Sequence, residues 1–161
     1  MVRVIGIAAV LSVLAGLVGI APPAGAAPNG CGPDQAAAVQ SALAQFPADP
    51  ATGYKWSSKP QESNYDPCAD LSAVVVTVEG ATGSSPDQAL LFHRGTYIGT
   101  GTLKAYPFTH LVAGKSTKDT VVLSYAYGKS CTACDDGKLA TVRYRWNGTK
   151  VQMLDPPPPS S

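Results

Sequence analysis

The chain has 161 residues, enough for one domain, and it is 45% hydrophobic but only 14% charged. Its 12 lysines and arginines and 11 aspartates and glutamates give a formal net charge of +1. This balance gives no electrostatic reason to expect nucleic acid or an anionic lipid surface as a partner. The 16 glycines and 14 prolines indicate frequent turns.

Residues 1–26 have the pattern of a secretory signal peptide. Arg3 supplies a positive charge, the 18 residues from Val4 to Ala21 carry none, and two prolines end the apolar run. Ala24-Gly25-Ala26 then fits the small-residue site of a signal peptidase, so we predict cleavage after Ala26. The alternative is an uncleaved membrane anchor, because 18 apolar residues just suffice to cross a bilayer.

Cys31 raises a second route to the cell envelope, acylation of a lipoprotein cysteine. Gly30 suits the last position of a lipoprotein box, but Pro28 and Asn29 do not resemble the rest of one. Cys31 also lies well beyond the apolar run. We therefore expect a structural role for Cys31 and a secreted or periplasmic protein, with a lipid anchor on the outer face of the plasma membrane as the alternative.

Four cysteines, Cys31, Cys68, Cys131 and Cys134, make an even set in an exported chain, where disulfides persist. Three pairings are possible. We favour Cys31–Cys68 with Cys131–Cys134, since the first bridge would tie the start of the domain to the segment before its first strand.

Cys131-Thr132-Ala133-Cys134 also matches the C-x-x-C motif of thiol oxidoreductases. Those enzymes place the motif at a helix N-terminus, whereas the turn-forming residues 135–137 follow here. Zinc needs more ligands than this pair supplies, and His93 and His110 lie in separate strand-like segments without ligand spacing. We expect no metal site and no cofactor.

One helix is predicted in the chain. Asp34 can cap a segment from Gln35 to Phe46 that is rich in good helix formers, with Val39 and Leu43 on one apolar face. Residues 49–67 follow as a polar stretch without period. Its aromatic residues, Tyr54, Trp56 and Tyr65, either form a binding platform or cover the core, and we favour the core.

Strand patterns dominate the rest of the chain. The predicted strands cover residues 71–79, 88–93, 96–100, 108–113, 120–127, 140–146 and 150–154. Arg94-Gly95 is predicted to close a hairpin, and Asn147-Gly148 to form a type I′ turn. Gly99 and Gly101 indicate a bulge or a close approach of backbone.

These elements predict an α+β fold, in which one N-terminal helix packs on an antiparallel sheet of about six or seven strands, stapled by disulfides. Residues 27–154 would form this single domain. Residues 155–161 would form a proline-rich tail, with Pro156–Pro159 in polyproline conformation and without a core role.

Several segments together resemble the LppP/LprE family of mycobacterial and related actinobacterial envelope lipoproteins. The most specific is Ser84-Ser85-Pro86-Asp87-Gln88-Ala89-Leu90-Leu91-Phe92, which runs into Tyr97-Ile98-Gly99-Thr100. The order of Cys31, Trp56, Cys68, Asp119–Tyr125 and Thr141–Tyr144 agrees with it. The resemblance implies an envelope location but no catalytic residues. A family lipoprotein carries its acylated cysteine upstream of the domain cysteines, and this chain has none there.

No catalytic motif stands out, so we expect a non-enzymatic binding or accessory domain with an unidentified envelope ligand or protein as partner. Its contacts would use the Ser84–Pro86 loop, the Arg94-Gly95 turn or the aromatic loop. The alternatives are a hydrolase and, less favoured, a thiol oxidoreductase. A hydrolase would use Ser84 or Ser85 as nucleophile, His93 or His110 as base and Asp87 as the orienting group.

Overall fold

The computed structural model describes residues 30–131, 134 and 136–159. The predicted signal peptide, residues 1–26, therefore lies outside the described residues. Within the described ranges, no helix is long and apolar enough to cross a membrane.

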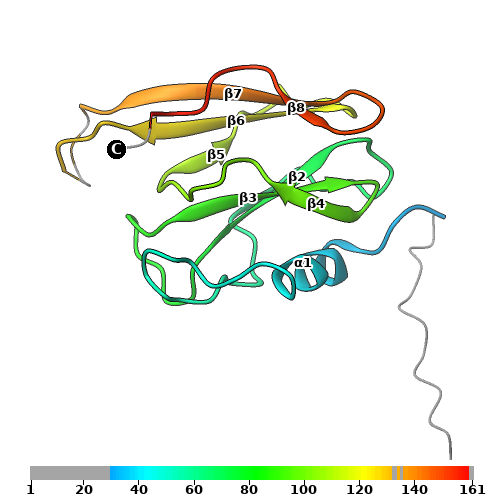
Figure 1. Ribbon diagram of the computed structural model, residues 1–161, viewed down its shortest axis with the longest axis horizontal. Helices are drawn as coiled ribbons and strands as arrows, with labels where there is room; N and C mark the ends of the chain where they lie inside the picture. Colours follow the sequence, from blue (N-terminus) through cyan, green and yellow to red (C-terminus); the bar gives the residue numbers. More distant parts are fainter. Residues whose placement is uncertain (1–29, 132–133, 135, 160–161) are drawn as a thin grey trace, which may run out of the picture.

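The described chain forms one helix and two four-stranded sheets, stacked in three layers (Figure 1). The helix α1 spans Gln35–Leu43. The first sheet contains β1 (Glu62–Ser63), β2 (Ser72–Thr77), β3 (Asp87–His93) and β4 (Thr96–Thr100). The second contains β5 (Thr109–Leu111), β6 (Thr120–Tyr127), β7 (Lys138–Trp146) and β8 (Val151–Met153). Neighbouring strands are consecutive and antiparallel throughout.

The predicted fold class is wrong, because the protein is mostly β and has two sheets rather than one sheet under a helix. After β4 the chain crosses to a second layer instead of adding β5 to the first sheet. Hydrophobic patterns indicate where strands lie, but they do not say which strands pair. The eighth strand, β1, was missed because Glu62 and Ser63 are polar and join the sheet by backbone pairing with Val75 and Val74.

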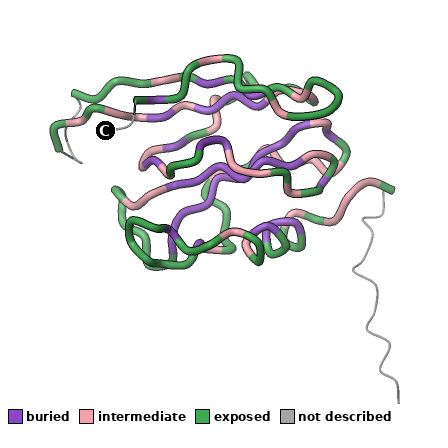
Figure 2. The backbone as a smooth tube through the Cα atoms, in the orientation of Figure 1, coloured by how far each residue is buried: buried purple, intermediate pink, exposed green. Residues whose placement is uncertain are grey.

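The first sheet is buried on both faces, and this creates two cores (Figure 2). One face of β2 and β3 packs on the second sheet, and the other packs under α1 and the loop that follows it. The inter-sheet core contains Leu71, Val75, Leu91, Leu123, Tyr125, Val142 and Tyr144 among others. The helix-side core contains Val39, Ala42, Trp56, Val74, Val76, Leu90 and Phe92 among others.

The helix begins where the sequence predicts it, but it is shorter than predicted. The Asp34 side chain accepts a hydrogen bond from the backbone N–H of Ala37 at 2.9 Å, as expected of an N-cap. The helix ends at Leu43 instead of Phe46. Phe46 still packs against the helix-side core, where its ring stacks on Trp56 with centroids 5.3 Å apart.

The hairpin and bulge predicted around β4 are confirmed. Arg94 and Gly95 both adopt positive φ, 46° and 78°, and connect β3 to β4. The register shifts between Leu91 and Phe92, opposite a Gly99 with φ 131°. Gly101 is a close approach, since a Cβ there would lie 2.9 Å from the Tyr125 hydroxyl.

The second predicted turn is wrong in type. Four residues, 147–150, separate the paired Trp146 and Val151, so Asn147-Gly148 is not a two-residue type I′ turn. Instead the side-chain oxygen Oδ1 of Asn147 accepts hydrogen bonds from the backbone N–H of Thr149 at 3.0 Å and of Lys150 at 2.9 Å. The Asn147 side chain thus shapes the loop together with a backbone hydrogen bond from the Asn147 N–H to the carbonyl oxygen of Lys150 at 3.1 Å.

The structure joins Cys31 to Cys68 and Cys131 to Cys134, with Cα–Cα distances of 5.2 and 5.1 Å. The Cys31–Cys68 bridge fixes the residues before α1 against the turn that precedes β2. Gly32 lies in this contact, where a Cβ would come within 2.5 Å of the Arg94 carbonyl oxygen. The bridge therefore joins two segments of the chain, and Gly32 beside it packs against the Arg94-Gly95 turn.

Removing the Cys31–Cys68 bridge should cost more stability than removing the Cys131–Cys134 bridge. The separations of 37 and 3 residues give losses of about 4 and about 2 kcal/mol in the loop-entropy account. Chemical denaturation of the two double variants, Cys31→Ala with Cys68→Ala and Cys131→Ala with Cys134→Ala, measures both. Equal losses would contradict the dependence on loop length.

Candidate functional site

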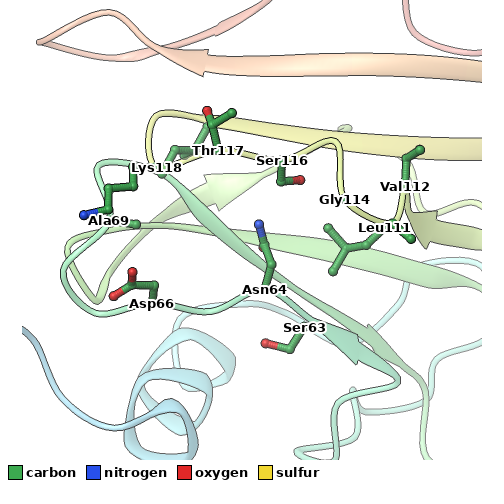
Figure 3. Close-up of a pocket in the computed structure, with 12 residues that line it drawn as sticks. Ser63, Asn64, Asp66, Ala69, Leu111, Val112, Gly114, Ser116, Thr117 and Lys118 are labelled. Atoms are coloured by element: carbon green, nitrogen blue, oxygen red, sulfur yellow. The ribbon is translucent and has the colours of Figure 1, made fainter.

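An open cleft lies between the two sheets, beside the short strands β1 and β5 (Figure 3). Its volume is about 510 Å³. One wall comes from the segment around β1 and β2, and the other from the loop between β5 and β6. The lining residues are Ser63, Asn64, Asp66, Ala69, Leu71, Leu111, Val112, Ala113, Gly114, Ser116, Thr117 and Lys118. We refer to this space as the inter-sheet cleft.

Two contacts between the sheets frame the inter-sheet cleft. At one end the backbone N–H of Leu71 donates to the carbonyl oxygen of Lys118 at 2.9 Å. At the other, the Glu62 carboxylate accepts a hydrogen bond from the backbone N–H of Leu111 at 2.6 Å and lies 2.8 Å from His110 Nδ1. These contacts hold the walls of the cleft at a fixed separation.

The cleft presents polar groups over an aliphatic floor. The Asn64 side-chain oxygen accepts from the backbone N–H of Ala73 at 2.8 Å, which leaves the Asn64 amide nitrogen directed into the cleft (Figure 3). Asp66 and Lys118, whose side chains carry opposite charges, also line the cleft. The floor includes the aliphatic side chain of Leu111. Such a surface can hold a ligand that has hydrogen-bonding groups and an apolar portion.

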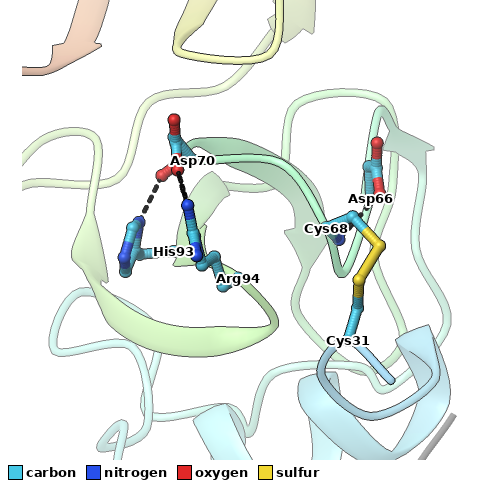
Figure 4. Close-up of polar contacts among 6 residues, drawn as sticks. All are labelled: Cys31, Asp66, Cys68, Asp70, His93 and Arg94. Atoms are coloured by element: carbon cyan, nitrogen blue, oxygen red, sulfur yellow. Dashed lines mark hydrogen bonds and ion pairs between the residues drawn. A yellow bond between two sulfur atoms is a disulfide. The ribbon is translucent and has the colours of Figure 1, made fainter. Parts of the chain in front are cut away.

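The two histidines considered as bases have structural contacts. His93 Nδ1 lies 2.6 Å from the carbonyl oxygen of Asp70, which can only accept, so Nδ1 is the donor (Figure 4). The His93 ring stacks on Trp146 with centroids 3.9 Å apart, and this joins the two sheets. His110 faces Glu62, as described above.

The serines considered as nucleophiles lie elsewhere. Ser85 Oγ accepts a hydrogen bond from the backbone N–H of Thr82 at 2.8 Å, as part of a turn. Ser84 lines a different hollow, next to Tyr106 and Phe108. Among the hydrogen bonds of the described residues, neither serine is paired with a histidine. The geometry thus brings Asp87 near His110, whereas no hydrogen bond among the described residues joins Ser84 or Ser85 to either of them.

Asp87 is only 8% exposed and ties the two sheets together. Its carboxylate accepts a hydrogen bond from the backbone N–H of Thr109 at 3.3 Å and one from Gln61 Nε2 at 3.2 Å. Burial raises the pKa of the Asp87 carboxyl above its usual value, although hydrogen bonds and the nearby His110 oppose the shift. Asp87 is therefore a buried structural carboxylate at the rim of the sandwich.

The Arg94-Gly95 turn, predicted as a contact site, is held to the body of the domain. The Arg94 guanidinium binds one carboxylate oxygen of Asp70 through Nε at 3.1 Å and Nη2 at 3.0 Å (Figure 4). Asp66, nearby, accepts from the backbone N–H of Cys68 at 2.8 Å. These contacts and the Cys31–Cys68 disulfide fix the turn in place.

The aromatic loop mostly covers the core, as favoured from the sequence. Trp56 Nε1 donates to the carbonyl oxygen of Pro47 at 3.0 Å, and the Tyr65 hydroxyl donates to that of Pro33 at 2.7 Å. Tyr54 is 60% exposed. No binding platform of three aromatic side chains is formed in this loop.

Two disulfides, two packed sheets and a cleft between them define a small disulfide-bridged β domain with a candidate binding site. The model of the LppP/LprE lipoprotein family matches residues 63–149, which is more than half of the sequence. The chain belongs to the LppP/LprE lipoprotein family, as its resemblance indicated. Membership indicates the cell envelope as its location.

Mycobacterial relatives agree with this assignment. LprE of Mycobacterium tuberculosis is 35% identical over 116 residues, which are 72% of this chain and 54% of LprE. LprE of Mycobacterium leprae is 32% identical over 141 residues, which are 83% of this chain and 65% of the relative. The chain thus spans less than two thirds of the length of these relatives. No solved structure matches it.

The raised pKa of Asp87 predicts a pH dependence. The native state keeps the Asp87 proton at pH values where the unfolded chain has lost it, so this contribution is complete below about pH 3.8 and is lost as the pH rises through the native pKa. The free energy of unfolding of the wild type, relative to Asp87→Asn, should fall as the pH rises through this window. Denaturation titrations at several pH values measure it.

Asp155→Asn provides the control of opposite sign. Hydrogen bonds from Arg143 lower the pKa of Asp155 to about 2, so its contribution is present above about pH 3.8 and is lost as the pH falls through 2. A difference between wild type and Asp87→Asn that rises with pH would show that burial does not control the Asp87 carboxyl.

Proposed function

We propose that this protein is a non-enzymatic binding or accessory domain of the cell envelope, with the inter-sheet cleft as its ligand site. The observation that carries the proposal is the cleft itself, whose lining combines the Asn64 amide and the charged residues Asp66 and Lys118 with the aliphatic Leu111. Its volume of about 510 Å³ lies within the usual range for small-molecule sites. The ligand would be a small envelope molecule or short peptide segment with both polar and apolar parts.

The contacts of the hydrolase candidates support binding over catalysis. A nucleophilic serine needs a base within about 3 Å, or one bridging water. In the described structure Ser85 belongs to a turn, and His93 is held between Asp70 and Trp146. The polar groups of the cleft are suited to hold a molecule by hydrogen bonds without reacting with it.

We further propose that the protein reaches the envelope by cleavage after Ala26 and acts as a secreted or periplasmic domain. Cys31 bears on the alternative of a lipid anchor. A sulfur atom in the Cys31–Cys68 disulfide has no free valence for a thioether to lipid. Acylation of Cys31 would therefore leave Cys68 without its partner.

The intact mass of the protein from its own host tests this export route. We expect the mass of a chain that begins at Ala27, with all four cysteines alkylated only after reduction, because both disulfides form outside the cytoplasm. A chain that begins at Cys31 and carries added acyl mass would show the lipoprotein form instead.

Crosslinking in intact cells tests the ligand site. A photoreactive benzophenone side chain in place of Lys118, which lines the cleft, should give reproducible adducts. The same side chain in place of Lys150, which is exposed in the β7–β8 loop, is the matched control and should not. Ala113→Trp, which places a bulky ring in the cleft, should reduce the adducts of the Lys118 position. Identical adducts at both positions, or none at Lys118, would contradict the proposal.

A further inference from the structure

The proline-rich tail does not leave the domain after β8, contrary to the expectation that it has no core role. Asp155 accepts hydrogen bonds from Arg143 Nε at 2.8 Å and Nη2 at 2.9 Å, and from the Arg143 backbone N–H at 2.9 Å. A paired, bidentate contact of this kind fixes direction as well as position. The tail thus starts from a defined point on β7.

The four consecutive prolines, Pro156–Pro159, can make only a few kinds of contact. Proline has a fixed φ and no backbone N–H, so four in succession favour the extended polyproline II helix and cannot extend a sheet. Only the ring surfaces and the carbonyl oxygens of such a segment can bind another group. A surface that holds it must therefore offer apolar or aromatic side chains and a hydrogen-bond donor.

Tyr106 offers both properties. Pro158 is buried, and its carbonyl oxygen accepts a hydrogen bond from the Tyr106 hydroxyl at 3.2 Å. The Tyr106 side chain is itself only 8% exposed and packs edge-on against Tyr125, with ring centroids 5.7 Å apart. Aromatic side chains with a donor for a proline carbonyl are the usual means of recognising polyproline segments.

Further aromatic side chains lie beside Tyr106, outside its contact with the tail. Tyr106 also lines a hollow of about 340 Å³ together with Pro107, Phe108 and Tyr127. Phe108 adopts a φ of 58°, which a bulky side chain rarely takes, and its ring lies 4.4 Å from Lys129 Nζ. We call Tyr106, Pro107, Phe108 and Tyr127 the aromatic surface.

We propose that Arg143 and Tyr106 bind a proline-rich segment of a partner protein, which would continue from Tyr106 into the open hollow of the aromatic surface, and that the chain's own tail occupies these two contacts in the absence of that partner. The preferred segment has an acidic residue followed by prolines, because Asp155 and Pro158 show which groups Arg143 and Tyr106 bind. The covalently attached tail competes at an effective concentration of roughly millimolar order, so the partner must displace it.

The test uses the full chain and a synthetic peptide, Asp-Pro-Pro-Pro-Pro-Ser-Ser. Asp155→Asn weakens the hold on the chain's own tail but leaves Arg143 and Tyr106 available to the peptide. Titration calorimetry should show peptide binding at least about tenfold tighter to Asp155→Asn than to the wild type. Pro158→Ala, which loosens the tail at its other contact, should shift the affinity in the same direction.

Two further variants test whether the peptide binds at Tyr106 and whether its binding depends on loss of the Asp155 contact in particular. Tyr106→Phe in the Asp155→Asn background should weaken the peptide by roughly fivefold, since one hydrogen bond is lost. Asp119→Asn breaks a comparable exposed pair with Arg145, 3.1 Å apart, and should bind the peptide as the wild type does. NMR shifts of the backbone amides next to Tyr106 should change on peptide addition and on tail release.

Three outcomes would overturn the proposal. Peptide affinity that is the same for the wild type, Asp155→Asn and Pro158→Ala would show that the tail covers no site. Equal binding of a peptide with alanines in place of its prolines would show that polyproline is not recognised. A dimer of Asp155→Asn whose formation the peptide blocks would identify the occupant as the tail of a second copy.

Discussion

The arrangement of the whole domain depends on burial of both faces of the β2–β3 hairpin. Val75 and Leu91 face the second sheet, whereas Val74 and Leu90 face the helix. A sheet that is apolar on both sides must be covered twice, since burying one large aliphatic side chain contributes roughly 1.5–3 kcal/mol. The second sheet and the helix with its loop provide the two covers, and this sets the three-layer order.

Two carboxylates of the first sheet accept hydrogen bonds from the second sheet and so connect the two. Strand β5 lies at the edge of its sheet, and the outward N–H groups of Thr109 and Leu111 are bound by Asp87 and Glu62. An edge strand with unbound N–H groups is a template for pairing with another chain, and these carboxylates block that at β5. The same contacts position the β5–β6 loop opposite Asn64, so the cleft follows from how the edge is closed.

The two proposed sites lie in different parts of the fold. The inter-sheet cleft is bounded by β1, β2 and the β5–β6 loop, and the aromatic surface by the segment before β5 and the end of β6. A family relative that is longer than this chain has further segments to contribute, since LprE of Mycobacterium tuberculosis is only 54% covered. The linings of the two proposed sites share no residue, so a ligand in the cleft would not exclude a segment bound at the aromatic surface.

The sequence by itself determined the elements whose causes are local. The β-branched run through Val74–Val76, the alternation along Val121–Tyr125, the Asp34 cap and the Arg94-Gly95 turn each depend on neighbouring residues only, and the structure has them. The family resemblance likewise depends on motif order. Only the tertiary structure decided the number of sheets, because pairing depends on which apolar faces meet, and strand patterns are alike in one sheet or two. It also decided the sites: Asn64 lies across the cleft from residues 112–118, and the Tyr106 hydroxyl donates to the carbonyl oxygen of Pro158, 52 residues away. No local sequence pattern indicates either arrangement, because each brings together segments that are far apart in the chain.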